Sequence, residues 1–137
     1  ALGLRGLVGG VVDWGRRPAP YVQVGDGPSV PLPAPDAAPT MSVAQALQQR
    51  RSLRDYADRA MTSEELAWVV HGATGITQTR GGLRTAPSAG ALYPLETYVA
   101  VNRVEGIEAG LYHVDVRGGA LEPMRTGSAP NLSRYSD

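Results

Sequence analysis

The sequence contains no cysteine and no lysine, and it has only two histidines among its 137 residues. The absence of cysteine excludes disulfides, thiolate metal sites and thiol catalysis. It also means that cysteine usage does not indicate whether the protein works in a reducing or an oxidising compartment. His71 and His113 are widely separated in the sequence, which argues against a zinc site, so we expect no bound metal. All thirteen basic side chains are arginines, and thirteen Asp and Glu balance them to a formal net charge of +0. This balance predicts no general attraction to nucleic acid or to an anionic membrane.

The sequence also lacks a hydrophobic run long enough to span a bilayer. The apolar, glycine-rich stretch at residues 1–12 is interrupted by Arg5 and is shorter than the roughly 20 residues that a membrane helix needs. It shows neither the basic start nor the small-residue cleavage site of a secretory signal. We therefore expect a soluble, cytoplasmic protein, and the chain length predicts one globular domain.

Proline and glycine are concentrated in the first forty residues, which hold seven of the eleven prolines and seven of the seventeen glycines. Long helices and central strands are disfavoured there, so we predict an extended arm over residues 1–40. Residues 29–33 have the proline pattern of a segment that lies along another surface. For residues 1–27, an ordered wrap and a disordered linker are equally compatible with the composition.

Two capping boxes predict the starts of two helices. Ser42 lies three residues before Gln45, and apolar residues at helical spacing follow, so we predict a helix from about residue 43 to 51. Thr62 lies three residues before Glu65 in the same way, and Gly72 and Gly75 are predicted to end the helix that follows. The apolar face of this second helix is predicted to consist of Leu66, Val69, Val70 and Ala73.

The second half of the sequence predicts β-structure. A long loop over residues 77–90 precedes a strand over 95–104, and because both faces of that strand are mostly apolar, we place it in the centre of a sheet. Residues 111–116 and 120–124 predict a hairpin around the turn 117–119. The order helix, helix, strand, hairpin indicates an α+β fold.

The first candidate binding feature is a cationic run at the end of the first predicted helix, formed by Arg50, Arg51, Ser52 and Arg54. Arg50 and Arg54 lie on the same side whether the segment is helical or extended. Guanidinium groups donate paired, charge-assisted hydrogen bonds to phosphate, and the serine hydroxyl adds another donor. Taken alone, the run is better explained as solvated arginines that complement the helix C-terminus.

The second candidate feature is the segment 84–94, which is rich in small residues and proline. Small residues allow a flat ligand to approach the backbone, although a tight loop before a strand has the same composition. Within it, Arg84 is a candidate for contact with a bound ring or a substrate, with a solvated loop arginine as the alternative. Tyr93 is a candidate to line the pocket or to donate a proton, with an aromatic residue at the edge of the core as the alternative.

A serine hydrolase built on Ser88, His113 and Asp115 is disfavoured. Ser88 lies between Pro87 and Ala89 rather than in the Gly-x-Ser-x-Gly context of a nucleophile elbow. His113 and Asp115 lie two residues apart on one predicted strand face, which leaves little freedom to form a relay, so we expect His113 to be structural.

In order and spacing, these motifs resemble the FMN-dependent nitroreductase superfamily, and most closely its SagB-type branch of azoline dehydrogenases. The resemblance covers about residues 28–127 and includes the Arg-Arg-Ser-x-Arg run followed by Asp55 and Tyr56. Its other matching stretches are residues 62–66, 71–77, 83–94 and 110–113. We accordingly divide the chain into an arm at 1–40, the N-terminal half of a nitroreductase-like domain at 41–127, and a tail at 128–137.

The resemblance implies an FMN-binding oxidoreductase of α+β, nitroreductase-like fold, in which two chains form a dimer with flavin sites at the interface. The residues that it implies for the flavin phosphate and part of the ring system are Arg50, Arg51, Ser52 and Arg54. The residues that it implies beside the isoalloxazine ring, often supplied by the partner subunit, are Pro87, Ser88, Ala89 and Gly90. Many simple nitroreductases have an asparagine where this chain has Ala91, which favours the SagB-type branch and its oxidation of peptide azolines to azoles.

The resemblance covers only the N-terminal half of the family's domain. The lysine and tyrosine implied in proton transfer belong to the other half, and this sequence has no lysine, so no catalytic residue is assigned. A half-domain would leave the strand at 95–104 short of neighbours, so we expect a homodimer or a complementary chain. The chain is then a fragment, a piece of a split protein or a degenerate member, and the alternative function is a noncatalytic binding or interaction module.

Overall fold

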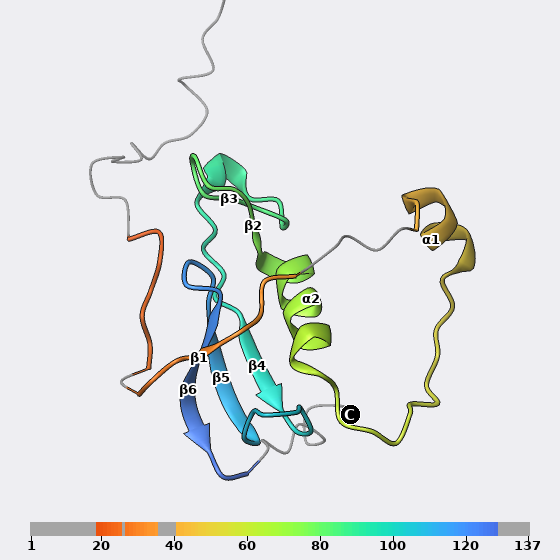
Figure 1. Ribbon diagram of the computed structural model, residues 1–137. Helices are drawn as coiled ribbons and strands as arrows, with labels where there is room; N and C mark the ends of the chain where they lie inside the picture. The colour runs from red at the N-terminus through yellow and green to blue at the C-terminus, as the bar shows by residue number, and fades with distance from the viewer. Residues whose placement is uncertain (1–18, 26, 36–40, 129–137) are drawn as a thin grey trace, which may run out of the picture.

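The structure is a computed structural model that describes residues 19–25, 27–35 and 41–128. Most of the predicted tail and residues 1–18 of the predicted arm lie outside the described residues. The elements, in chain order (Figure 1), are β1 (Val30–Pro31), α1 (Val43–Gln49), α2 (Ser63–Thr74), β2 (Ile76–Gln78), β3 (Leu83–Arg84), the 3-10 helix η3 (Ala89–Ala91), β4 (Tyr98–Val101), β5 (Gly110–Asp115) and β6 (Ala120–Thr126).

Four strands form an antiparallel sheet in the order β1-β6-β5-β4. β5 and β6 are the predicted hairpin, and Asp115 closes its turn because its Oδ1 accepts hydrogen bonds from the backbone N–H groups of Arg117 and Gly118 at 3.0 and 2.9 Å. Gly119 follows with φ +63°, a conformation that glycine adopts without strain. The hairpin prediction is therefore confirmed.

The predicted central strand over residues 95–104 is wrong in length and in place. β4 covers only Tyr98–Val101 and lies at the edge of the sheet, paired on one side with β5. Val101 is buried in the core, but Leu95 is 82% exposed and Tyr98 is 49% exposed. The two apolar faces therefore belong to a strand with one open edge within the described part of the chain, rather than to a strand between two neighbours.

α2 packs against one face of the sheet. Its side chain Leu66 joins Val101, Tyr112, Val114 and Leu121 in the buried core. The predicted capping box is present, since Thr62 Oγ1 accepts from the Glu65 amide at 3.2 Å and Glu65 Oε2 accepts from the Thr62 amide at 2.9 Å. No helix in the residues that the structure describes is long and apolar enough to cross a membrane.

The predicted apolar face of α2 is partly wrong. Val69 is 62% exposed, whereas Ala67 and Thr74 are buried beside Leu66. Leu66 and Thr74 are buried and Val70 is partly buried at a spacing of four residues, and the buried residue 67 lies next to Leu66. The position of the sheet therefore selects a stripe that is rotated away from Val69 and Ala73, which are exposed. The prediction that Gly72 ends the helix is also wrong, because α2 continues to Thr74 and is capped by Gly75.

The described part of the arm lies against the sheet. β1 pairs with β6 through Val30 and Leu121, and the Leu32 amide donates to the carbonyl of Gly119 at 3.0 Å. This confirms that residues 29–33 lie along another surface. Upstream, the Val24 amide donates to Glu122 Oε2 at 3.0 Å, so residues near 24 contact the sheet on the face that carries the Glu122 side chain.

α1 stands apart from the rest of the described chain (Figure 1). The predicted Ser42–Gln45 capping box is present, but the helix ends at Gln49, two residues earlier than predicted. None of its residues is buried, and the apolar side chains Val43 and Leu47 are 77% and 72% exposed. The apolar stripe of α1 therefore has no covering partner among the described residues.

The predicted loop over residues 77–90 contains more regular structure than expected. β2 and β3 form a two-stranded hairpin in which Ile76 pairs with Arg84 and Gln78 with Leu83. Gly81 and Gly82 make the connection possible because both have positive φ, at +97° and +63°. The hairpin brings Arg84 back beside the C-terminal end of α2.

Candidate functional site

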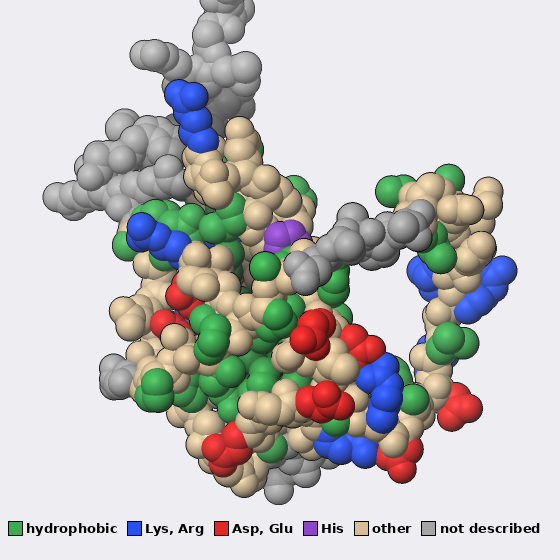
Figure 2. Space-filling model, viewed as in Figure 1, with side chains coloured by type: hydrophobic (Ala, Val, Ile, Leu, Met, Phe, Trp, Pro, Cys, Tyr) green, Lys and Arg blue, Asp and Glu red, His purple; other side chains and the backbone are tan. Residues whose placement is uncertain are grey.

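The cationic run lies on the exposed segment that follows α1. All residues from 50 to 54 are exposed, and Figure 2 shows blue arginine side chains gathered beside that helix. The Arg50 amide donates to the Ala46 carbonyl at 2.9 Å and so closes the helix. Arg51 Nη1 donates to the carbonyls of Gln48 and Arg50 at 3.0 and 2.8 Å. Arg51 therefore caps carbonyl groups at the C-terminus of α1, which is the structural role that the sequence offered as the alternative to phosphate binding. The side chains of Arg50 and Arg54 remain exposed to solvent.

The Pro-Ser segment borders a cavity of about 370 Å³ between the end of α2 and the residues that precede β4. Pro87, Ser88, Arg84 and Tyr93 line this cavity, together with mainly apolar or small side chains. Ala89 and Gly90 are exposed in η3 and do not line it. In Figure 1, η3 and α1 lie in separate parts of the molecule, so one chain does not bring the two predicted parts of the site together.

Tyr93 is held at both ends by hydrogen bonds. Its backbone N–H donates to Ser88 Oγ at 2.8 Å, and its phenolic oxygen accepts from the Arg84 backbone N–H at 3.0 Å. Tyr93 and Ala91 have φ values of +44° and +51°, which are unfavourable for residues with a side chain. Strain of this kind persists where surrounding contacts impose it. Ser88 is thus a structural acceptor, and Tyr93 is a pocket residue held in a fixed position.

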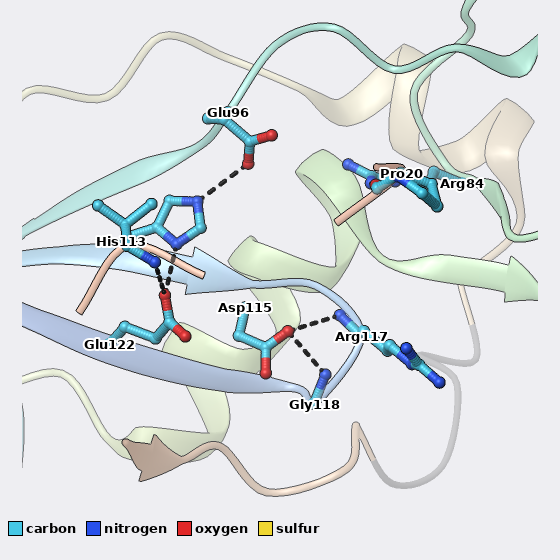
Figure 3. Close-up of polar contacts among 9 residues, drawn as sticks. Pro20, Arg84, Glu96, His113, Asp115, Arg117, Gly118 and Glu122 are labelled. Atoms are coloured by element: carbon cyan, nitrogen blue, oxygen red, sulfur yellow. Dashed lines mark hydrogen bonds and ion pairs between the residues drawn. The ribbon is translucent and has the colours of Figure 1, made fainter. Parts of the chain in front are cut away.

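Arg84 lies within cation–π distance of aromatic rings contributed by two distant segments. Its Cζ is 4.7 Å from the ring centroid of Tyr93 and 5.6 Å from that of Tyr21 in the arm. Its Nη2 donates to the Pro20 carbonyl at 3.2 Å, and Figure 3 shows the two residues side by side. Its Nε is buried and has no hydrogen-bond partner among the described residues. Arg84 is therefore not a solvated loop arginine, which was the alternative interpretation of its sequence context.

His113 forms a buried polar cluster with two carboxylates (Figure 3). It is 1% exposed, and its Nδ1 and Nε2 lie 2.9 Å from Glu122 Oε2 and 2.9 Å from Glu96 Oε2. Burial opposes protonation of the imidazole, but the hydrogen bonds and charges of both glutamates outweigh it and raise the His113 pKa. The Val24 amide and His113 both hydrogen-bond Glu122 and lower the pKa of its carboxyl group. His113 thus has the structural role predicted for it.

The two glutamates around His113 were missed in the sequence. Glu122 was detectable, because the hairpin register that pairs Asp115 with Ala120 also pairs His113 with Glu122. Glu96 precedes β4 in an irregular stretch, and no sequence signal places it there. His113 is bonded to Glu96 and Glu122, and Asp115 is bonded to turn amides, so the described residues form no Ser-His-Asp relay.

The sequence and the fold both match those of a known protein family. Residues 47–132 match the sequence profile of the nitroreductase family, which is more than half of the chain. The chain belongs to the nitroreductase family. The family prediction and the α+β, nitroreductase-like fold prediction are thereby confirmed.

Individual relatives agree with this assignment. The chain is 41% identical over 86 residues to "Putative nitroreductase MJ1384" of Methanocaldococcus jannaschii, covering 63% of this chain and 42% of that protein. It is 44% identical over 46 residues to the trifolitoxin-processing protein TfxB of Rhizobium leguminosarum bv. trifolii, covering 33% of this chain and 12% of that protein. The crystal structure of a "putative nitroreductase" from Ralstonia eutropha JMP134 superposes with a TM-score of 0.63 and 30% identity over 79% of this chain and 49% of that one. The chain therefore spans less than half the length of each of these relatives.

Proposed function

We propose that the protein is an FMN-dependent oxidoreductase of the SagB type, which oxidises peptide azolines to azoles. The observation that carries the proposal is the presence of both flavin-binding motifs of the resemblance, the run at 50–54 and the segment at 87–90, within the residues that match the family. Ala91 supports the SagB-type branch, as does the similarity to a protein named for the processing of trifolitoxin.

The residues present fit the charge and shape of FMN. Arg50 and Arg54 are exposed, and neither forms an ion pair within the described part of the chain, so both are available to a phosphate dianion, with Ser52 between them. The cavity beside Pro87 and Ser88 has one charged residue in an otherwise uncharged lining, which suits a flat ring with a polar edge. Bound FMN would supply two-electron hydride chemistry, and this chain's residues would bind and orient it.

A site shared between two chains accounts for the separation of the two motifs. α1 and the cationic run lie apart from η3 and the Pro87 cavity in one chain, and the apolar stripe of α1 is exposed. A helix of seven residues is too short to be stable without packing, so α1 requires a partner surface. We propose a homodimer, or a pairing with a complementary chain, in which α1 packs on the partner and brings the cationic run to the partner's Pro-Ser cavity.

A noncatalytic interaction module is the second candidate. The open edge of β4 favours it, because an unpaired strand edge is a ready template for another chain. In that case β4 would bind a partner strand and the arginine run would not hold a cofactor.

The two candidate functions predict different flavin contents and oligomeric states for the purified protein. An absorbance spectrum over about 300 to 500 nm, with released cofactor identified by mass, measures flavin content. Light scattering on the same sample measures the oligomeric state. Stoichiometric FMN on a dimer is expected for the oxidoreductase, and peptide azolines should then be consumed in the presence of an electron acceptor. A colourless protein that does not bind added FMN would overturn this proposal and leave the interaction module.

A further inference from the structure

Arg84 is the one charged residue lining two neighbouring cavities in the described part of the chain. The cavity beside Pro87 and Ser88 has a volume of about 370 Å³, and a second one beside Tyr21 and Gly82 has a volume of about 260 Å³. The other residues that line them are apolar, small or neutral. Within these two cavities Arg84 is therefore the one group that attracts an anion by its charge, and the apolar lining strengthens that attraction.

The hydrogen-bonding capacity of Arg84 is largely unused. A guanidinium group has several N–H donors, and among the described residues only Nη2 has a hydrogen-bond partner, the carbonyl of Pro20. Nε is buried and unpaired among the described residues. Glu96 and Asp115 line a third, very small cavity together with Arg84, but neither pairs with it, since Glu96 pairs with His113 and Asp115 with the turn amides. Because Nε is buried, the terminal nitrogens Nη1 and Nη2 are the donors that a ligand oxygen can reach.

The protein also restrains the position of the guanidinium group. Tyr93 and Tyr21 contact it from two segments, and Tyr93 is itself held in a strained backbone conformation by its two hydrogen bonds. A fixed guanidinium loses little entropy when it binds a planar anion through two parallel hydrogen bonds. This rigidity is expected of a recognition group and is not needed for a solvated surface arginine.

We propose that Arg84 binds a carboxylate group of the substrate in the cavity beside Tyr21 and Gly82, next to the cavity that we assign to the flavin ring. This inference rests on the proposed function and deepens it, because it gives the substrate class as a molecule that carries a carboxylate near the group that is oxidised. Pro20 and Tyr21 belong to the arm, so the arm completes the subsite by a hydrogen bond and an aromatic contact to the guanidinium group.

The test compares two probes of nearly equal shape, benzoate and its neutral counterpart benzamide. Their binding to the full 137-residue chain is measured by chemical-shift titration of backbone amides, with and without added FMN. Arg84→Gln removes the charge, and Arg84→Lys keeps the charge but loses the planar fork. Arg125→Gln, at the exposed end of β6, is the matched control for a change of net charge. Circular dichroism establishes that each variant is folded.

Benzoate is expected to bind the parent chain about tenfold or more tightly than benzamide. Arg84→Gln should bind the two probes equally, Arg84→Lys should keep part of the preference, and Arg125→Gln should keep all of it. The parent comparison needs no variant, so it remains decisive if Arg84→Gln does not fold. Equal binding of the two probes by the parent, an unchanged preference in Arg84→Gln, or a loss in Arg125→Gln would overturn the inference.

The FMN titrations separate this inference from the proposed function. A benzoate preference that persists when FMN is bound supports a carboxylate subsite for substrate. If FMN instead displaces benzoate and Arg84→Gln abolishes FMN binding, Arg84 holds the cofactor phosphate and the substrate assignment is overturned. A chain that prefers benzoate but does not bind FMN would refute the flavin proposal and retain an anion site. A chain that binds FMN without preferring benzoate would refute the subsite alone.

Discussion

Replacing Glu122 with glutamine should destabilise the protein in a pH-dependent way. Glu122 Oε2 accepts hydrogen bonds from His113 Nδ1 and from the Val24 amide. Glutamine has one acceptor oxygen and no charge, so it can keep one of these bonds but loses the ionic contact with His113. A hydrogen bond to a charged group contributes about 1.5–3 kcal/mol, and we expect Glu122→Gln to lower the free energy of unfolding by that amount near pH 6. The loss stays below the 3–5 kcal/mol typical of a broken buried pair because Glu96 still neutralises the imidazolium.

The sign of the pH dependence follows from the two shifted groups. The His113 pKa is raised above its ordinary value of 6.5 in the folded protein, so its stabilisation is complete below that pH and is lost as the pH rises through the folded-state pKa. The Glu122 pKa is lowered from 4.5, so its contribution is present above that pH and is lost as the pH falls through the folded-state pKa. The contribution of this cluster to stability should therefore be greatest between 4.5 and 6.5.

Urea unfolding followed by circular dichroism, from about pH 5 to pH 9, measures both effects. The parent chain should become less stable above neutral pH, and the difference between parent and Glu122→Gln should shrink over the same range. Glu108→Gln, which removes an exposed carboxylate, is the control and should have little effect. A parent chain that gains stability from pH 6 to pH 9, or a Glu122→Gln deficit that is constant with pH, would refute the reasoning.

Four further variants test other parts of the structure. Arg50→Ala and Arg54→Ala should each weaken FMN binding by about 1.5–3 kcal/mol in a flavin fluorescence titration, and unchanged affinity in both would refute the phosphate assignment. Thr62→Ala removes the side-chain cap of α2 and should lower stability by about 1 kcal/mol in thermal unfolding; an unchanged midpoint would show that the cap contributes nothing. Leu47→Glu places a charge on the exposed stripe of α1 and should yield monomers in light scattering, whereas an unchanged mass would exclude α1 from the interface.

Local features of the fold could be predicted because they depend on residues close together in the sequence. A capping box is defined by two residues three positions apart, and the hairpin by a glycine turn between two apolar runs. The edge position of β4 could not be predicted, because its apolar pattern is the same whether one or two neighbours are present. The buried stripe of α2 was misplaced at Val69 for a similar reason, since the helix sequence does not specify where the sheet lies.

The candidate site was predictable in composition but not in arrangement. The cationic run and the Pro-Ser segment are visible as motifs, and Arg84 and Tyr93 were identified within the second of them. The contact between Arg84 and Tyr21 joins residues that are 63 positions apart, and only the folded arm brings them together. The pairing of His113 with Glu96 likewise depends on an irregular segment, for which sequence periodicity gives no information.

The pairing of β1 with β6 has a consequence for how copies of this protein can associate. β1 is short and contains Pro31, which has no backbone N–H to donate, so another strand cannot readily pair with its outer edge. Short edge strands with proline protect natural proteins from aggregation in the same way. In the described part of the chain, β4 is then the edge of this sheet open to growth. Two chains that join through β4 would each present β1 outward, so the combined sheet would stop at two copies rather than extend into a fibre.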